Sequence, residues 1–169
     1  MKLAIVDVDK IPENIKDVSL DDPMEIFKIC REMESVCEKE DGLGLSAAQL
    51  GVPLKLFVMK SEGFPLVPKG EFGYFVNCNY ETTEGEQVVS LEGCLSVRSQ
   101  DGQLRLFQVD RQTSIRIKGY ILELNNEDLR FSAVDCEVGF NEQSVVLQHE
   151  IDHQRGVLIS DIGKEIMIW

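Results

Sequence analysis

Two histidines four residues apart, near the end of the chain, constrain this sequence more than any other feature. They are the only histidines in its 169 residues, and residues 145–153 read Val-Val-Leu-Gln-His-Glu-Ile-Asp-His. On an α-helix, residues four apart lie on one face, so His149 and His153 can bind one metal ion while Glu150 leans toward the same side. This arrangement is typical of metal-dependent hydrolases.

The neighbouring residues of this helix predict an apolar environment for the metal. Ile151 points away from the two histidines, whereas Val145 and Val146 lie one turn earlier and flank the direction of His149. A metal here would lie in a dry pocket. The alternative is a surface helix with two unconnected histidines, because the same spacing also occurs by chance.

Two imidazole groups do not complete the ligands of a catalytic metal, which commonly takes three protein groups and one water molecule. No histidine remains elsewhere in the chain, so the third ligand must be a Cys, Asp or Glu side chain. Cys94 belongs to a Glu-Gly-Cys-Leu-Ser segment, residues 92–96, that interrupts a strand-like pattern. It is either this third ligand or a buried structural thiol.

Length and composition indicate one globular domain. A chain of 169 residues with 43% hydrophobic residues can form one sizeable core. No apolar run is long enough to cross a bilayer. The first residues carry acidic side chains inside an apolar stretch, which indicates a strand rather than a signal peptide. We therefore expect the protein to remain in the cytoplasm where it is made.

Charge and cysteine content disfavour several classes of function. A formal net charge of −13 disfavours general affinity for nucleic acids and anionic membranes, because both require basic surfaces. The five cysteines are an odd number and form no Cys-x-x-Cys pair, so neither a disulfide framework nor a four-cysteine zinc site is expected. Free thiols fit a reducing compartment.

The first helix has clear boundaries in the sequence. Asp22 is its expected N-cap, Pro23 suits its first turn, and Glu25 lies three residues after the cap. Apolar residues then recur at helical spacing, at Ile26, Cys30, Met33 and Cys37. This pattern places Cys30 and Cys37 in the core rather than in a metal site.

Strands are predicted where β-branched and aromatic residues run between Gly, Pro and Asn. The expected strands cover residues 3–8, 54–59, 74–80, 113–122 and 129–134. The last two form a hairpin around Asn125 and Asn126. Asn141 is the expected N-cap of the histidine helix, and Gly156 is its expected left-handed end.

A glycine-rich segment, residues 41–51, reads Asp-Gly-Leu-Gly-Leu-Ser-Ala-Ala-Gln-Leu-Gly. A dinucleotide-binding turn would follow a strand and open a helix, whereas this segment follows a helix, so nucleotide binding is not expected. We interpret it as a wall where Gly44, which lacks a Cβ, lets another chain approach and where Gln49 offers a side-chain amide. A tight packing turn is the alternative.

Three segments, in this order, resemble those that mark one family, the peptide deformylases. The family has a Gly-x-Gly-x-Ala-Ala-x-Gln segment, a Glu-Gly-Cys-Leu-Ser segment and a Gln-His-Glu-x-Asp-His helix. This chain matches the second at residues 92–96 and the third at residues 148–153 in full. It departs from the first, at residues 42–49, only by Ser46 in place of the common alanine. The resemblance extends up to about Asp161.

The resemblance implies an α+β fold in which antiparallel sheets pack around a central metal-binding helix, with residues 1–169 forming one compact catalytic domain. It implies that one divalent metal is held by Cys94, His149 and His153. A fourth position is left for water, whose proton Glu150 would accept. The developing negative charge would be met by the metal, the Gln49 amide and the backbone N–H of Leu95.

The implied substrate is an N-formylmethionyl nascent peptide, which the enzyme hydrolyses to formate and a free amino terminus. The peptide would lie beside Gly44 like an added strand, and its methionine would enter an apolar slot. That slot would be lined by Leu43, Val145 and Val146. Gln148 and Asp152 are expected to support the ligands or pack the helix, and Glu92 to orient the loop around Cys94.

The resemblance also implies ferrous iron as the native metal, with zinc, nickel or cobalt able to bind the same ligands. We expect a monomer without direct nucleic-acid or membrane binding. The tail after His153 is short, whereas some bacterial relatives dock at the ribosome through a long C-terminal helix, so ribosome docking is not expected. The chain would suit a compact phage-borne or organellar lineage as well as a bacterial one.

The loop after Cys94 departs from the family. Many relatives have proline after Val97, whereas here Arg98 begins a charged stretch through Arg105. The resemblance therefore does not specify the conformation of this loop, nor any arginine that steadies the peptide.

Two other functions compete with deformylation. A peptidase of the His-Glu-x-x-His class would need a histidine six residues after His153, where Ile159 stands, or a downstream glutamate, for which Glu165 is the sole candidate. A non-catalytic binding module would close the metal with four protein ligands.

Overall fold

The computed structural model describes residues 3–126 and 128–167 of the chain. Its elements, in chain order, are η1 (Val8–Lys10), α1 (Pro23–Lys39), β1 (Gly44–Ser46), η2 (Ala47–Leu50), β2 (Leu56–Lys60), β3 (Phe72–Arg98), β4 (Leu104–Asn125), β5 (Asp128–Gly139), α2 (Glu142–Gln154), α3 (Ile159–Ile162) and β6 (Lys164–Ile166). Within these residues, no helix is both long and apolar enough to cross a membrane.

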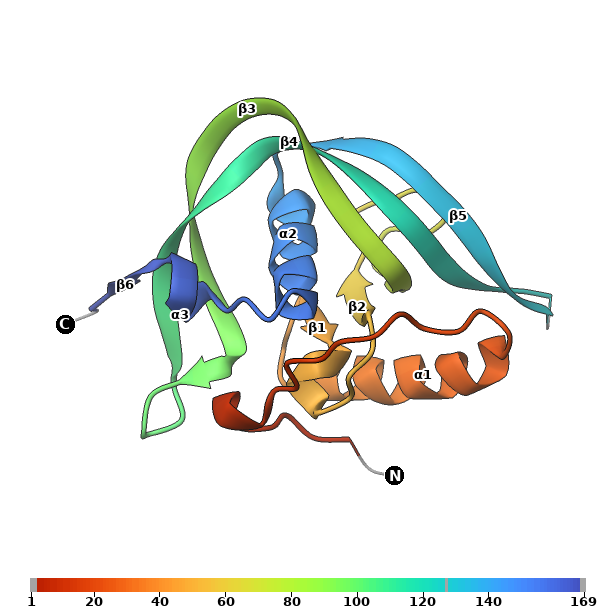
Figure 1. Cartoon of the computed structure of the whole chain (residues 1–169), viewed down its shortest axis with the longest axis horizontal. Helices are drawn as coiled ribbons and strands as arrows, with labels where there is room; N and C mark the ends of the chain where they lie inside the picture. The colour runs from red at the N-terminus through yellow and green to blue at the C-terminus, as the bar shows by residue number, and fades with distance from the viewer. Residues whose placement is uncertain (1–2, 127, 168–169) are drawn as a thin grey trace.

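Two long antiparallel strands, β3 and β4, form an arch over the rest of the molecule (Figure 1). The sheet has the order β1-β2-β3-β4-β5, and every neighbouring pair is antiparallel. The first part of β4 also pairs with β6, and its last part pairs with β5. α2 stands under the arch and α1 lies across the base (Figure 1). The predicted α+β fold with antiparallel strands around a central helix is confirmed.

Caps in the sequence define the ends of both long helices. The Asp22 side chain accepts a hydrogen bond from the Glu25 N–H at the start of α1. The Asn141 side chain accepts one of 2.7 Å from the Ser144 N–H at the start of α2. After α2, Gly156 adopts a φ of 73°, a left-handed conformation that costs glycine little. The predicted helix boundaries are confirmed.

The pair β1 and β2 separates two hydrophobic clusters. Leu45 and Val58 face α1 and pack with its apolar stripe, which consists of Ile26, Cys30, Met33 and Cys37. Phe57 and Met59 lie on the opposite face and pack against α2. Full burial of one such side chain contributes about 1.5–3 kcal/mol, so these clusters hold both helices to the sheet. Cys30 and Cys37 are core residues, as predicted.

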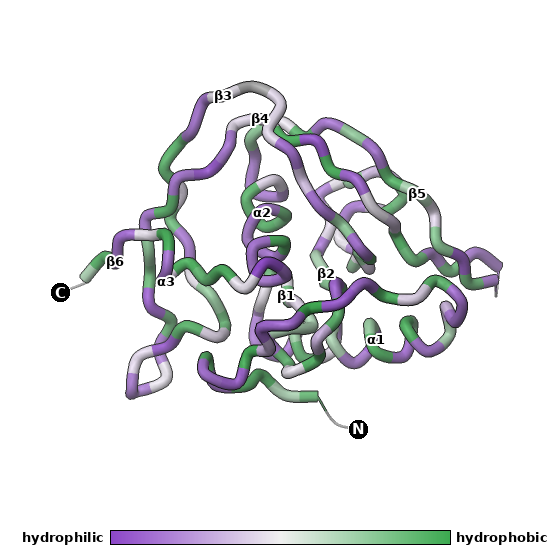
Figure 2. Tube along the Cα trace, viewed as in Figure 1, coloured by the Kyte–Doolittle hydropathy of each residue, from purple (hydrophilic) through white to green (hydrophobic). Residues whose placement is uncertain are grey.

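α2 is almost wholly buried although it carries many polar residues. Its buried polar residues are Ser144, Gln148, His149, Glu150, Asp152, His153 and Gln154. Figure 2 shows hydrophilic stretches along this helix in the middle of the molecule. Burial of a polar group costs free energy unless the group finds a partner. The partners of these side chains therefore indicate what the helix does.

The predicted strand at residues 3–8 is wrong. The chain is irregular from Leu3 to Asp7 and then enters η1. A strand needs a neighbouring edge to pair with. Here the N–H of Val6 donates to the carbonyl of Gln49, which belongs to the short helix η2 and not to a strand.

The other predicted strands are confirmed with changed bounds. Residues 54–59 correspond to β2, and residues 74–80, 113–122 and 129–134 lie within β3, β4 and β5. The hairpin between β4 and β5 closes where Asn125 pairs with Asp128. The strands β3 and β4 run further than predicted because they continue through polar residues on the arch, which lie exposed to solvent.

Candidate active site

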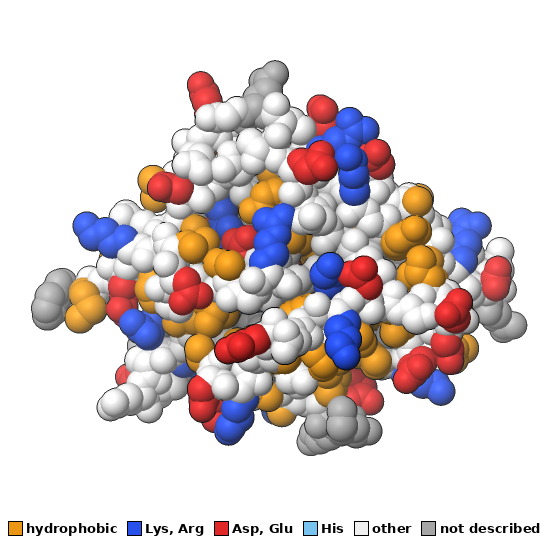
Figure 3. Space-filling view, in the orientation of Figure 1, with side chains coloured by type: hydrophobic (Ala, Val, Ile, Leu, Met, Phe, Trp, Pro, Cys, Tyr) orange, Lys and Arg blue, Asp and Glu red, His pale blue; other side chains and the backbone are white. Residues whose placement is uncertain are grey.

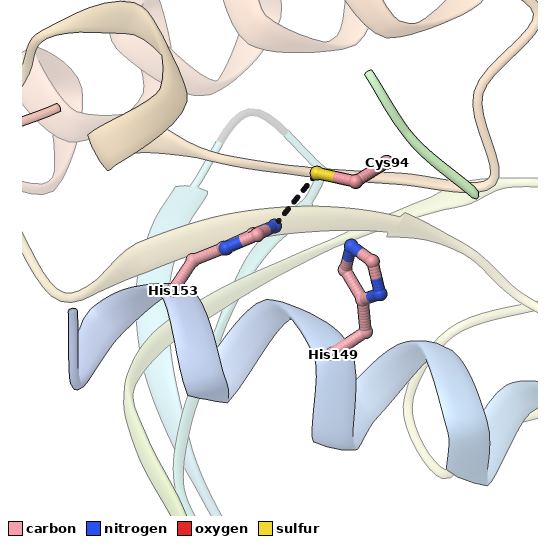
Figure 4. Close-up of side chains that lie close together, drawn as sticks. All are labelled: Cys94, His149 and His153. Atoms are coloured by element: carbon pink, nitrogen blue, oxygen red, sulfur yellow. Dashed lines mark hydrogen bonds between the residues drawn. The ribbon is translucent and has the colours of Figure 1, made fainter. Parts of the chain in front are cut away.

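Three predicted metal ligands meet beside α2. The Sγ of Cys94 and one ring nitrogen each of His149 and His153 lie within 4.8 Å of one another, and all three side chains are buried. The sulfur lies 3.4 Å from the Nε2 of His153, and the two imidazole rings stand nearly perpendicular with centroids 4.7 Å apart. Figure 4 shows both histidines projecting from the same side of α2 toward the sulfur.

An irregularity in β3 turns its cysteine toward the helix. The pairing of β3 with β4 skips from Gly93 opposite Leu106 to Arg98 opposite Leu104. Residues 94–97 therefore lie opposite one residue of β4. A bulge of this kind bends its strand and redirects side chains. That is why a cysteine inside a long strand reaches two histidines of a helix.

Hydrogen bonds at the far ring nitrogens orient both imidazoles. The Nδ1 of His149 lies 2.8 Å from Glu92 Oε2, and the Nδ1 of His153 lies 3.2 Å from the carbonyl oxygen of Val157. Both partners are acceptors, so each Nδ1 donates a proton and each Nε2 is directed away from these partners. Metal-binding histidines are commonly oriented in this way.

Arg111 of β4 joins the groups around the site. Its guanidinium donates to both oxygens of Glu92, at 2.7 and 2.8 Å, and to Asp152 at 2.5 Å. All three side chains are buried. One cation thus lies between a carboxylate of β3 and a carboxylate of α2. Glu92 in turn contacts His149, one of the predicted metal ligands.

Arg111 was not among the predicted site residues, although its place in a series of buried apolar positions could have identified it. Along β4, buried residues alternate with more exposed ones. The buried residues lie on one face of the strand and include Phe107, Val109, Arg111, Ile115 and Ile117. An arginine in such an apolar series requires buried acidic partners, because an uncompensated buried charge is strongly destabilising. The period-two pattern could therefore have identified it.

The two histidines differ in their electrostatic surroundings: positive charge is favoured at His149, whereas burial and the neighbouring His149 lower the pKa of His153. Burial raises the pKa of Glu92, but hydrogen bonds from Arg111 and His149 outweigh it and lower that pKa to about 2. Burial lowers the pKa of His149, but hydrogen bonds with Cys94 and Glu92 raise it to about 10. Positive charge is thus stabilised at the imidazole, and a coordinated metal ion would supply such charge.

The donor set fits a divalent transition metal with an open coordination position. Two imidazole nitrogens and a thiolate suit several first-row metals. A structural site would take a fourth protein ligand. In the described part of the chain, no fourth His, Cys, Asp or Glu atom joins the three. The arrangement therefore resembles a catalytic centre and not a closed structural site.

Glu150 lies beside the ligands and lines an open cleft. It is 3% exposed, and burial raises the pKa of its carboxyl group to about 7 against the opposing effect of His149. A carboxylate with a pKa near the working pH is suited to accept and return a proton.

Gly44 makes room for this carboxylate. A Cβ at this position would lie 2.8 Å from the Oε1 of Glu150 and 2.8 Å from the Cγ1 of Val146, which is closer than real side chains come. The contact seen at Gly44 is with the chain's own α2, and the approach of a peptide stays a prediction. Any larger residue would force the side chains of Glu150 and Val146 to move.

Gln49 directs its amide nitrogen at Cys94. Its Oε1 accepts a hydrogen bond of 2.9 Å from the Ser46 N–H. Its Nε2 then donates to the Ser96 hydroxyl at 3.1 Å and to the Cys94 Sγ at 3.4 Å. Leu95 follows the cysteine in the part of β3 that leaves the regular ladder. Both predicted donors thus lie next to the cysteine.

The cleft has a volume of about 540 Å³, which suits a short peptide segment. The predicted substrate residues Leu43, Gly44, Val145 and Val146 all line it. So do Gln49, Cys94, Leu95, His149 and Glu150, and the Nε2 of His153 lies 3.4 Å from the Cys94 sulfur. The structure therefore brings together all of the predicted site residues.

Two further predicted residues fix α2 in place. The Gln148 side chain accepts from the N–H of Gln112 at 2.9 Å and donates to its carbonyl at 3.1 Å, which ties α2 to β4. Asp152 binds Arg111. Both contacts are those of supporting residues and neither side chain joins the ligand cluster.

The charged stretch after Val97 forms a closed turn. Arg98 donates to the carbonyl of Leu95 at 3.0 Å and to that of Gly102 at 2.9 Å, and it pairs with Glu40. Arg98 thus holds the loop that follows the cysteine.

The peptidase alternative fails on the position of its glutamate. Glu165 lies on β6 and pairs with Arg105 at 2.8 Å. Ile159, at the position where that class can have a histidine, packs in a small apolar cluster.

A buried Cys-His-His cluster with a glutamate on the same helix, at the side of an open cleft, defines a metal-dependent hydrolase. Comparison with known proteins gives the family. Residues 2–166 match the family described as polypeptide deformylase, and the chain belongs to it.

Comparisons with individual proteins lead to the same family. The peptide deformylase of Syntrophomonas wolfei is 34% identical over 143 residues, which cover 85% of this chain and 80% of the relative. The crystal structure of peptide deformylase from Thermotoga maritima has a TM-score of 0.75 at 26% identity, covering 96% of this chain and 97% of that one. A probable peptide deformylase from Synechococcus phage S-SSM7 has a TM-score of 0.72 at 25% identity, covering 95% and 99%.

Arg111→Met should destabilise the protein by about 3–5 kcal/mol, because it leaves two buried carboxylates without their cation. The measurement is urea unfolding of the variant and the wild type. Arg116→Gln is the matched control on the same strand. It removes an exposed pair with Asp135 and should cost less than about 1 kcal/mol. Equal losses for the two variants would contradict the role given to Arg111.

Proposed function

We propose that this chain hydrolyses the formyl amide of N-formylmethionyl peptides with Glu150 as general base and with Gln49 and Leu95 as donors to the developing oxyanion. One divalent metal would be held by Cys94, His149 and His153. Membership of the polypeptide deformylase family makes the chain a hydrolase that removes the N-formyl group from newly synthesised proteins. The observation that supports the residue roles is the convergence of three ligand atoms within 4.8 Å, next to a buried glutamate.

The formyl oxygen would lie where the Nε2 of Gln49 and the N–H of Leu95 can both donate to it. Gln49 cannot turn freely, because its Oε1 already accepts from the Ser46 N–H. Donors that are fixed before the substrate binds stabilise developing charge without reorganisation, by about 2.7–4 kcal/mol for one donor. The contact with Cys94 keeps this amide next to the metal ligands.

The proton is moved by Glu150. When bound, the divalent metal would polarise the formyl carbonyl group and make a water molecule acidic enough to attack near neutral pH. Glu150 accepts the proton of the attacking water and then donates it to the amine nitrogen as the C–N bond breaks. Formate and a free amino terminus result. The same carboxyl group serves both steps because burial keeps its two protonation states close in free energy.

The methionine side chain would enter the apolar part of the cleft. Leu43, Val145 and Val146 line this part, and all three are at least partly accessible to solvent. β1 lies at one end of the strand order, so its second edge has no strand partner among the described residues. A peptide could pair with that edge beside Gly44 like an added strand.

Glu150→Gln removes the proton acceptor and keeps the size of the side chain. We expect formate release from a short N-formylmethionyl peptide to slow by at least about 100-fold, with metal content and melting temperature unchanged. Glu137→Gln makes the same change on the exposed surface of β5 and should keep full activity. Turnover of Glu150→Gln at the wild-type rate would exclude Glu150 as the base.

Ferrous iron is the metal that we propose for the native enzyme, with zinc, nickel or cobalt as possible substitutes. The ligand set suits all four ions. The four metal forms should differ in how readily oxygen inactivates them. A thiolate bound to iron is readily oxidised in air.

The iron form, prepared without oxygen, should therefore lose activity on exposure to air, whereas the zinc and nickel forms should keep the activity they have. Deformylase activity and metal content are measured before and after aeration. Stable turnover in air, with iron confirmed in the protein, would contradict an oxidisable iron–thiolate site.

The enzyme would act as a cytoplasmic monomer that finds nascent peptides by diffusion, without binding nucleic acid or docking at the ribosome. Figure 3 shows basic side chains lying among acidic ones on the face seen there. Together with a net charge of −13, this distribution disfavours a general attraction to ribosomal RNA.

Acidic residues at the mouth of the cleft would influence which peptides bind. Glu40, Asp41 and Glu142 line the cleft, and no Lys or Arg does so among the described residues. Glu40 pairs with Arg98, but no ion pair to Asp41 or Glu142 forms within the described chain. A peptide that carries positive charge after its methionine would meet complementary charge here.

A formylmethionyl peptide with lysine after the methionine should therefore have a KM about two- to fivefold lower than one with glutamate, and added salt should reduce the difference. Glu142→Gln should reduce it as well. KM values for both peptides, measured with both proteins at low and high salt, test this. Equal KM values at low salt would show that the rim charges do not contact the peptide.

A further inference from the structure

Three buried polar side chains next to the site have no hydrogen-bond partner in the described part of the chain. They are the hydroxyl of Ser46, the Oε2 of Glu150 and the side-chain amide of Gln154. Their residues are 0%, 3% and 6% exposed. Buried polar groups in native proteins nearly always have a partner, so each such group requires an explanation. Because the three side chains lie on two neighbouring elements, β1 and α2, one explanation could account for all of them.

The hydroxyl of Ser46 faces α2. Gly44 and Ser46 are two residues apart on β1 and therefore lie on the same face of the strand. The position of a Cβ on Gly44 is in contact with Glu150. The strand neighbour of Ser46 is Phe57, which belongs to the cluster that packs on α2. Ser46 lies near the N–H of Gln49 at the start of η2, but its own O–H proton has no acceptor there.

β1 runs toward the C-terminal end of α2. Gly44 lies opposite Glu150, and Gln49, five residues later, donates to the sulfur that contacts His153. Ser46 lies roughly 7 Å beyond Gly44 along the strand. On α2, Gln154 lies one turn beyond Glu150, about 6 Å along the axis and about 40° around it. Both displacements run in the same direction from the contact between Gly44 and Glu150, so we expect the Ser46 hydroxyl and the Gln154 amide on the same side of that carboxylate.

We propose that these three side chains bind one buried water molecule that holds the carboxylate of Glu150 in position. A buried water typically makes about three hydrogen bonds to groups that otherwise lack partners. The water would donate to Glu150 Oε2 and accept from the Ser46 hydroxyl or the Gln154 Nε2. Glu150 Oε1, which lies against Gly44 in the wall of the cleft, is then kept facing the substrate.

Ser46 and Gln154 are positioning residues in this proposal, since they act through Glu150 and touch no substrate. The kinetic part rests on the proposed function, in which Glu150 moves the proton. The presence of the water is a separate statement, and a crystal structure of the metal-loaded protein tests it without any measurement of activity.

In that structure we expect an ordered water within about 2.7–3.2 Å of Glu150 Oε2 and of either Ser46 Oγ or a side-chain atom of Gln154. Direct hydrogen bonds among the three side chains, with no water between them, would overturn the proposal. So would a water that contacts only one of them.

The variants Ser46→Ala, Gln154→Met and the double variant test the effect on catalysis. Each single variant should lower kcat by about tenfold, as loss of a supporting hydrogen bond does, with KM within twofold of the wild type. The double variant should be no slower than the slower single one, because both side chains act through one water. Independent, multiplied losses or an unchanged kcat would contradict this coupling.

Ser144→Ala is the matched control. It removes a buried hydroxyl of α2 that already has partners in Asn141, so it should lower the melting temperature without changing kcat. If the wild-type protein releases no formate, the proposed function fails, and the crystal structure still decides whether the water is bound. If the wild type is active and the variants match it, only the positioning role fails.

Discussion

The structure depends on a buried arginine that pairs with two carboxylates around a polar helix. α2 carries two of the three predicted metal ligands, His149 and His153, and lies under the arch of β3 and β4, where a buried carboxylate without a partner is destabilising. Arg111 resolves this for two carboxylates at once, Glu92 and Asp152. Because Glu92 also binds His149, the arginine that compensates these buried carboxylates also fixes the partner of a predicted metal ligand.

Two local irregularities bring remote segments to this helix. The bulge in β3 moves Cys94 out of a regular ladder and toward the histidines. On the other side, the missing side chain of Gly44 lets β1 contact Glu150 directly. The bulge interrupts the regular pairing of β3, and the glycine lacks a side chain, and each brings its strand into contact with α2. The regular part of the sheet holds these two positions in place.

Two buried glutamates in the same site have opposite properties because their partners differ. Glu92 is held by Arg111 and His149, and its pKa falls to about 2, so it remains a fixed negative charge. Glu150 has no hydrogen-bonded cation, and burial raises its pKa to about 7. When the surroundings shift the pKa values of two carboxyl groups in opposite directions, one group can orient a neighbour while the other transfers a proton.

The sequence alone was enough to predict the two long helices, their caps, most strands and a set of candidate site residues. These follow from local rules: His149 and His153 lie four apart on a helix, and Asp22 and Asn141 cap helices through bonds three residues away. It did not determine which strands pair. Residues 3–8 were predicted as a strand, but they do not pair with an edge of the sheet. Nor did it determine that Arg111 compensates Glu92 and Asp152, or that Gly44 lies against Glu150. Those relations join segments far apart in the chain, and only tertiary packing decides them, because burial is what makes an unpaired charge or hydroxyl costly.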